Sequence, residues 1–163
     1  MMMSSSFRTC GGRHLARRSE LVRVRARLGG LSDILLIEDE APDAERLTAT
    51  LRVLLGYEAG IRWASSLGDA VDHIIASKPT IVFLDDILKP STDASQSIPL
   101  LRGAGYSGPI IIVSGMVTRS RRASLLTEGA SDVIHKDDVD SVRVGEALAR
   151  LCPNADGGEP PET

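Results

Sequence analysis

Apolar runs and amphipathic stretches alternate along the chain from Ser32 onward. The apolar runs are short and rich in Ile, Leu and Val, which predicts buried strands at residues 34–37, 61–64, 80–84, 110–113 and 133–135. The intervening and final stretches place apolar residues at helical spacing, which predicts helices at residues 42–55, 67–75, 94–102, 118–127 and 139–151. Strands this apolar suit a parallel sheet that is covered on both faces. The pattern therefore predicts an α/β fold, a three-layer, doubly wound (βα)5 parallel sheet.

Several residues mark where these helices begin or bend. Ser65 or Ser66 suits the N-cap of the second helix. Pro99 inside the third predicts a short, kinked or late-starting helix. Asp137 or Asp138 is predicted to cap the last one. The inner faces are predicted to include Leu67, Ala70, Val71, Ile74 and Ile75 in the second helix, and Val139, Val142, Leu148 and Leu151 in the last.

The two ends of the chain differ in composition from the part between them. Residues 1–31 are rich in Arg and Ser, with Glu20 as their single acidic residue, and are interpreted as a basic, disordered arm. An organelle transit peptide and a short basic helix are the alternatives. Residues 153–163 are rich in Pro, Gly and Glu and predict a disordered tail. The domain between them, residues 32–152, is acidic, which argues against a nucleic-acid-binding domain.

Composition also limits the compartment. No apolar run approaches the length of about 20 residues that a membrane span needs. Cys10 and Cys152 lie far apart and have no ligand-like spacing, which favours unpaired thiols in a reducing compartment. We therefore expect a cytoplasmic protein without a membrane span.

Four of the predicted strands end directly in polar residues. These residues are Glu38 and Asp39 after the first strand, Asp85 and Asp86 after the third, Ser114 after the fourth and Lys136 after the fifth. The carboxyl ends of parallel strands open on one edge, where α/β sheets hold their ligands. Two carboxylates about 4 Å apart repel by about 4 kcal/mol at an effective dielectric near 20, and Mg²⁺ bound by their oxygens would remove this conflict. Lys136 and Ser114 suit the oxygens of a phosphoryl group, with a central carboxylate as its nucleophile.

These segments resemble the receiver domain of bacterial two-component response regulators. The resemblance covers roughly residues 33–151 and rests on Leu-Leu-Ile-Glu-Asp-Glu at 35–40, Phe-Leu-Asp-Asp-Ile-Leu at 83–88, Val-Ser-Gly at 113–115 and Gly-Ala-Ser-Asp-Val-Ile-His-Lys at 129–136. It implies a flavodoxin-like strand order, 2-1-3-4-5. It also implies that Glu38 and Asp39 hold magnesium, that Ser114 senses the phosphoryl group and that Lys136 contacts it.

The resemblance leaves two candidates for the phosphoacceptor. The family usually shows Asp, two residues, an apolar residue and then Pro. Counting back from Pro90 gives Asp86, whereas counting back from the apolar Leu88 gives Asp85. We favour Asp85, because it directly follows the apolar run and its distance to the hydroxyl residue is nearer the family's habit. The backbone carbonyl of Ile87 would then be a further magnesium ligand.

Some positions depart from the family pattern or permit two interpretations. Asp137 stands where the family commonly has a cis-forming Pro, so a different loop shape and partner choice are expected. Val133 stands where an aromatic residue commonly changes rotamer on activation, which weakens any claim for an aromatic switch. Arg119, Arg121 and Arg122 are interpreted as a solvated face, with the steering of an acidic partner as the alternative.

The leading functional hypothesis is a stand-alone response regulator. A histidine kinase or histidine phosphotransfer protein would donate a phosphoryl group to Asp85, with Mg²⁺ as cofactor. The domain would catalyse only its own phosphorylation and dephosphorylation. No output domain is expected after Leu151, so output would be binding to another protein.

Two alternatives come from other functional classes. A receiver-like interaction module would bind partners without phosphorylation, and the retained acids, Ser114 and Lys136 argue against it. A flavodoxin-like cofactor binder would need a phosphate-binding loop after the first strand. Residues 38–43 read Glu-Asp-Glu-Ala-Pro-Asp and would repel phosphate unless a metal intervened.

Overall fold

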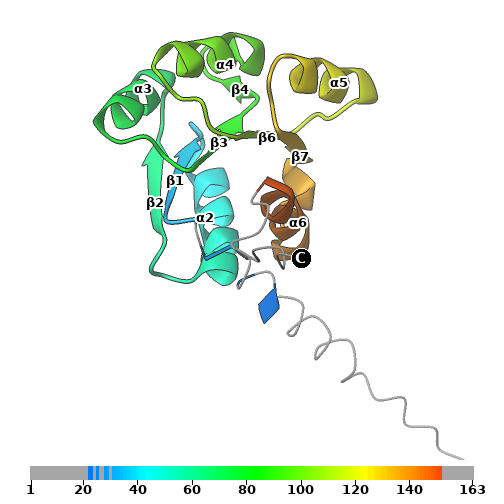
Figure 1. The fold of residues 1–163 in the computed structure, drawn as a ribbon. Coiled ribbons are helices and arrows are strands. Elements are labelled where there is room, and N and C mark those ends of the chain that lie inside the picture. The colour runs from blue at the N-terminus through cyan, green and yellow to red at the C-terminus, as the bar shows by residue number, and fades with distance from the viewer. Residues whose placement is uncertain (1–21, 24, 26–27, 30, 152–163) are drawn as a thin grey trace, which may run out of the picture.

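The structure is a computed structural model and describes residues 22–23, 25, 28–29 and 31–151. A five-stranded parallel sheet lies between two layers of helices (Figure 1). Its strands are β1 (Asp33–Ile37), β2 (Gly60–Ala64), β3 (Ile81–Asp85), β6 (Ile110–Ser114) and β7 (Asp132–His135). The helices that follow them are α2 (Ala41–Leu55), α3 (Leu67–Ala76), α4 (Ala94–Gly103), α5 (Arg119–Thr127) and α6 (Ser141–Leu151). The predicted (βα)5 architecture is confirmed.

The strand order in the sheet is β2-β1-β3-β6-β7, and every neighbouring pair is parallel. Counted along the main sheet alone, this is the predicted order 2-1-3-4-5. A small antiparallel pair, β4 (Ile87–Leu88) and β5 (Thr92–Asp93), lies outside that sheet. It occupies the segment between β3 and α4, where the sequence analysis predicts neither a strand nor a helix.

Alternating side chains of the strands fill two separate cores, one on each face of the sheet. On one face α3, α4 and α5 cover residues that include Val82 and Leu84 of β3. On the other face α2 and α6 cover residues that include Ile81 and Phe83. All five residues of β3 are buried, as are all five of β6. The continuous apolar runs therefore reflect burial on both faces, as predicted.

Side-chain caps stabilise the starts of α3, α4 and α5. Ser66 accepts a hydrogen bond from the backbone N–H of Asp69 at the start of α3, which confirms one of the two predicted caps. Thr118 caps α5 in the same way through the N–H of Arg121. Asp93 caps α4, which runs for ten residues despite an internal proline. Each cap satisfies a backbone donor that the first turn leaves without a partner.

The last helix begins later than predicted. Asp137 and Asp138 lie in a short 3-10 turn, and the carboxylate of Asp140 accepts from the backbone N–H of Arg143 at 2.8 Å. The prediction that Asp137 or Asp138 caps this helix was therefore wrong. Val142, predicted to face inward, is 52% exposed, because it lies about 200° around the helix from the buried Val144. The buried residues of α6 are Val144, Gly145, Ala147 and Leu148.

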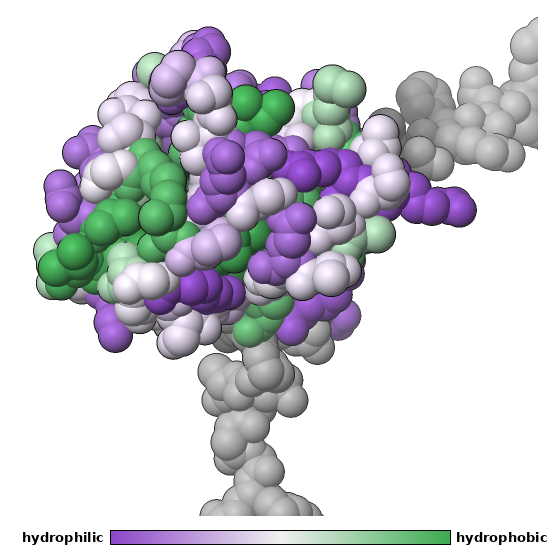
Figure 2. All heavy atoms as spheres, turned by 90° about the horizontal axis from the view of Figure 1, so that it is seen from above, coloured by the Kyte–Doolittle hydropathy of each residue, from purple (hydrophilic) through white to green (hydrophobic). Residues whose placement is uncertain are grey.

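The outer surface of α3, α4 and α5 is mixed in character. Figure 2 looks onto this side and shows hydrophobic patches among hydrophilic side chains. Ile75 of α3 and Leu100 of α4 are 70% and 54% exposed. Ile75 was predicted to face inward, but it follows the fully buried Ile74 and is rotated from it by about 100° around the helix.

The arm predicted at residues 1–31 and the tail predicted at 153–163 lie largely outside the described residues. Within the arm, Leu28 and Leu31 are buried against the α2 and α6 side of the sheet. In the part of the chain that the structure describes, no helix combines the length and apolar character of a membrane span.

Candidate functional site

The strand registers bring the predicted site residues to one edge of the sheet. Ile37 of β1 pairs with Leu84 of β3, and the next residues along the two strands are Glu38 and Asp85. Ser114 ends β6, and the β7 residue paired with it directly precedes Lys136. A cavity of about 330 Å³ opens at this edge, lined by Asp39, Glu40, Asp85, Asp86, Ile87, Lys89, Ser114, Gly115, Met116 and Lys136.

Three carboxylates lie close together at this edge of the sheet. Glu38, Asp39 and Asp85 each offer an oxygen, and these oxygens lie within 4.8 Å of one another. Glu38 and Asp85 are each only 6% exposed. A hard divalent cation such as Mg²⁺ prefers this donor set of carboxylate oxygens beside open space for water. The residues present therefore fit a magnesium ion.

Burial disfavours the charged forms of Glu38 and Asp85. Burial raises the pKa of Glu38 to about 7, a hydrogen bond from the N–H of Glu40 opposes this, and the charge of Asp85 adds to it. Burial likewise raises the pKa of Asp85, against the attraction of Lys136. A bound divalent cation would favour the charged forms of both.

Lys136 is the cation at the centre of the cluster. Its Nζ lies 2.9 Å from Oδ2 of Asp43, 3.2 Å from Oε2 of Glu38 and 3.4 Å from Oδ1 of Asp85. Burial alone would lower the pKa of Lys136, but these contacts outweigh burial and raise it. Sequence reasoning missed Asp43, although an acid in the first turn of the helix after the first strand points to the same edge.

The backbone of the loop after β1 is held from two sides. The indole N–H of Trp63 donates to the carbonyl of Glu38 at 2.7 Å. The N–H of Lys89 donates to Oδ2 of Asp39 at 3.3 Å, and the Lys89 ammonium is paired with Glu40. Trp63 is 46% exposed, and it supports this loop through its polar N–H.

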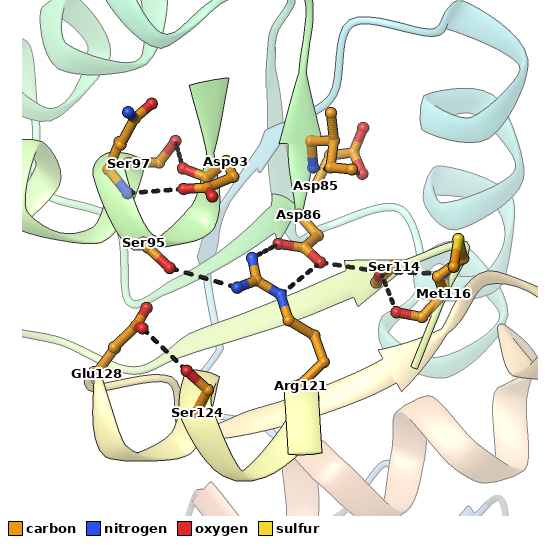
Figure 3. Close-up of polar contacts among 12 residues, drawn as sticks. Asp85, Asp86, Asp93, Ser95, Ser97, Ser114, Met116, Arg121, Ser124 and Glu128 are labelled. Carbon is orange, nitrogen blue, oxygen red and sulfur yellow. Dashed lines mark hydrogen bonds and ion pairs between the residues drawn. The ribbon is translucent and has the colours of Figure 1, made fainter. Parts of the chain in front are cut away.

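Asp86 belongs to a second polar cluster, on the α4 and α5 side (Figure 3). Its Oδ2 accepts from Oγ of Ser114 at 3.1 Å and from Nε of Arg121 at 3.2 Å. Nη2 of Arg121 donates to the other oxygen, Oδ1. Nη1 reaches the hydroxyl of Ser95 at 3.4 Å, which links the cluster to α4. Asp86 is thus 4% exposed and fully engaged.

The arginines at the start of α5 are therefore not a solvated face, as had been interpreted. Arg121 forms a two-point ion pair with Asp86. Arg122 contacts Asp132 at 2.9 Å and the carbonyl of Val133 at 2.6 Å. Only Arg119 of the three is exposed. Sequence alone did not reveal these partners, because they depend on how α5 is rotated against the sheet.

Ile87 lies beside Asp85 in β4 and lines the same cavity. Its backbone N–H lies 3.5 Å from Oδ1 of Asp85, while its side chain is 63% exposed. The short antiparallel pairing with Asp93 holds this segment beside the acids. The sequence predicted Ile87 as a ligand through its carbonyl, and that role stays a prediction.

No family model matches the chain, and no curated protein is similar to it in sequence. Solved structures resemble it throughout the described domain. The signal receiver domain of a DNA-binding response regulator from Colwellia psychrerythraea is 25% identical, with a TM-score of 0.66, over 76% of this chain and 99% of that one. The BeF3-activated receiver domain of RstA from Klebsiella pneumoniae is 25% identical, with a TM-score of 0.63, over 74% and 98%.

A more distant match supports the same fold. The signal receiver domain of a LuxO repressor protein from Vibrio parahaemolyticus is 21% identical, with a TM-score of 0.60, over 74% of this chain and 93% of that one. The strand order and the acidic cluster at the carboxyl edge agree with these matches. The described part of this chain has the fold of a response regulator receiver domain.

Proposed function

We propose that this domain accepts a phosphoryl group on Asp85 and signals by binding another protein. The observation that supports this most directly is the surroundings of Asp85. Its carboxylate lies among Glu38, Asp39 and Lys136 and lines the open cavity. Asp86 is a poorer candidate, because Arg121 and Ser114 already engage both of its oxygens.

The proposed reaction transfers the phosphoryl group from a phosphohistidine of a histidine kinase or a histidine phosphotransfer protein, in the cytoplasm. An oxygen of Asp85 attacks phosphorus, the P–N bond breaks, and the histidine nitrogen keeps its electron pair. The product is an acyl phosphate on Asp85. Catalysis of such a transfer comes chiefly from positioning and charge neutralisation.

Each charged or polar neighbour has a distinct part in this proposal. Glu38, Asp39, Asp85 and the carbonyl of Ile87 would hold Mg²⁺, which supplies positive charge at the phosphoryl oxygens. Lys136 places an ammonium beside Asp85 and would pair with another phosphoryl oxygen. Ser114 supplies a hydroxyl donor from β6. The acids alone would repel an anionic phosphoryl donor, so the site needs both Mg²⁺ and the Lys136 ammonium.

Incubation with Mg²⁺ and acetyl phosphate, followed by phosphate-affinity gels, tests the proposal. Wild type and Asp86→Asn are expected to be labelled, and Asp85→Asn is not. Labelling that survives in Asp85→Asn but disappears in Asp86→Asn would make Asp86 the acceptor. If neither acetyl phosphate nor a cognate kinase labels the wild type, the domain is an interaction module that works without phosphorylation.

A further inference from the structure

Asp86 and Arg121 form a buried ion pair that the proposed phosphorylation chemistry does not use. The Asp86 carboxylate is 5% exposed and the Arg121 side chain 28%. Consecutive residues of a strand point to opposite faces. Asp85 continues the side of Ile81 and Phe83, toward α2 and α6, whereas Asp86 continues the side of Val82 and Leu84. Asp86 therefore meets α5 while its neighbour meets Lys136.

Ser114 joins this ion pair to the phosphorylation site. Its hydroxyl carries a single hydrogen. In this structure the hydroxyl lies 3.1 Å from Oδ2 of Asp86 and 3.0 Å from the carbonyl of Met116. A hydroxyl that donates to a phosphoryl oxygen on Asp85 must give up the donation to Asp86. Asp86 and the phosphoryl group therefore compete for the same proton.

Arg121 links Asp86 to helix α5. The guanidinium spans Asp86 and the hydroxyl of Ser95, and it stands in the first turn of α5. The backbone N–H of Arg121 is also the donor to the Thr118 cap. A change at Asp86 thus acts on the residue that fixes the start of α5. Val133 is buried on the same side of the sheet, and its aliphatic side chain cannot take part in this hydrogen-bond network.

We propose that Asp86 and Arg121 are positioning residues that couple the state of Ser114 to the position of α5. The coupling rests on the proposed phosphorylation of Asp85. In the unphosphorylated domain Asp86 holds the Ser114 hydroxyl and the first turn of α5 together. When Ser114 turns to a phosphoryl group, Asp86 loses that donor and the Asp86–Arg121 pair repacks, which shifts α5. Two packings of one element, biased by a local charge, are a sufficient switch.

The test is NMR of the full chain with Mg²⁺ and beryllofluoride, a stable mimic of the phosphoryl group. Fluorine signals report beryllofluoride binding, and backbone amide shifts of residues 119–127 report α5. The variants are Arg121→Gln and, as a matched control on the same turn, the exposed Arg119→Gln. Wild type and Arg119→Gln are expected to bind and to shift α5. Arg121→Gln is expected to bind and to lose the α5 shift.

Two further variants keep the test decisive. Arg121→Lys retains the charge but not the two-point contact with Asp86, so a reduced α5 shift is expected. If Arg121→Gln disorders the helix, Arg121→Lys becomes the variant that tests the coupling. Asp86→Asn weakens the competing acceptor, so beryllofluoride is expected to bind about fivefold more tightly, as for one lost hydrogen bond, with the α5 shift lost.

The outcomes separate the two proposals. Unchanged α5 shifts in Arg121→Gln and Arg121→Lys, with beryllofluoride bound, overturn the coupling and leave Asp85 phosphorylation intact. Failure of wild type to bind beryllofluoride or to accept a phosphoryl group overturns the proposed function, and the coupling with it.

Discussion

Asp85 and Asp86 are consecutive in the chain, yet their carboxylates belong to two separate charge clusters. Oδ1 of Asp85 lies 3.4 Å from Nζ of Lys136, in the cluster of acids beside α2. Oδ2 of Asp86 accepts from Ser114 and Arg121 on the side of α4 and α5. The alternation of the strand therefore divides an acid pair into a candidate acceptor and a candidate structural partner.

Removal of Arg121 should destabilise the domain. Arg121→Ala leaves the buried Asp86 carboxylate without its cation, and we expect a loss of about 3 kcal/mol in the free energy of unfolding. Arg119→Ala, on the exposed side of the same turn, should change it by less than about 0.5 kcal/mol. Urea unfolding measures both. Equal, small effects of the two substitutions would show that the Asp86 pair does not stabilise the fold.

Asp132 should make stability depend on pH in the acid range. Burial raises its pKa, but hydrogen bonds from Arg143, Val133 and Arg122 outweigh burial, so the pKa lies below the ordinary 3.8. A carboxylate whose pKa is lower in the folded than in the unfolded state stabilises the fold at pH values above its unfolded-state pKa. That contribution is lost as the pH falls through its folded-state pKa. Asp132→Asn should therefore cost about 2 kcal/mol at neutral pH.

The pH profile distinguishes this carboxylate from others. The difference in unfolding free energy between wild type and Asp132→Asn should stay constant down to about pH 5 and shrink only below about pH 4. Urea unfolding at a series of pH values measures it. A difference that does not shrink below about pH 4 would show that the Asp132 pKa is not depressed in the folded state.

Trp63 should report and support magnesium binding. It is the single Trp of the chain, and its N–H donates to the carbonyl of Glu38. Mg²⁺ should change its fluorescence saturably, and Asp39→Asn should abolish that change. Trp63→Phe should weaken Mg²⁺ binding by about fivefold in calorimetry, since one hydrogen bond is lost. Binding by calorimetry with no fluorescence change would contradict this role for Trp63.

Asp43 should restrain Lys136. Nζ of Lys136 is nearer to Asp43 than to Asp85 or Glu38, so Asp43 competes with a phosphoryl oxygen for the ammonium. Asp43→Asn should speed labelling by acetyl phosphate about threefold, as expected for a partly exposed ion pair. The exposed Glu45→Gln, on the same helix, is the control. Slower labelling of Asp43→Asn would show that Asp43 positions Lys136 rather than competing for it.

The sequence predicted the sheet and its polar edge because both follow from local pattern. Strands buried on both faces, such as β3 and β6, must be continuous apolar runs. The ends of such runs meet at one edge, so the sequence alone groups Glu38, Asp85 and Lys136, and the structure brings them into contact.

Features that depend on helix rotation could not be predicted in this way. Arg121 finds Asp86 only because α5 presents that position of its first turn to the sheet. Val142 is exposed because α6 presents the opposite face, with Val144 and Leu148, to the sheet. The polar role of Trp63 depends on the edge position of β2 beside the loop that carries Glu38. Local pattern specifies elements, whereas these contacts arise from how the elements pack.

The most direct test of the central claim identifies the phosphorylated residue chemically. Protein labelled with acetyl phosphate and Mg²⁺ is treated with borohydride, which reduces an acyl phosphate to an alcohol with loss of phosphate and so converts the modified aspartate to homoserine. Tandem mass spectrometry then locates that residue. We predict homoserine at position 85 and unmodified aspartate at position 86. Homoserine at position 86, or at neither position in protein that is demonstrably phosphorylated, would contradict the account.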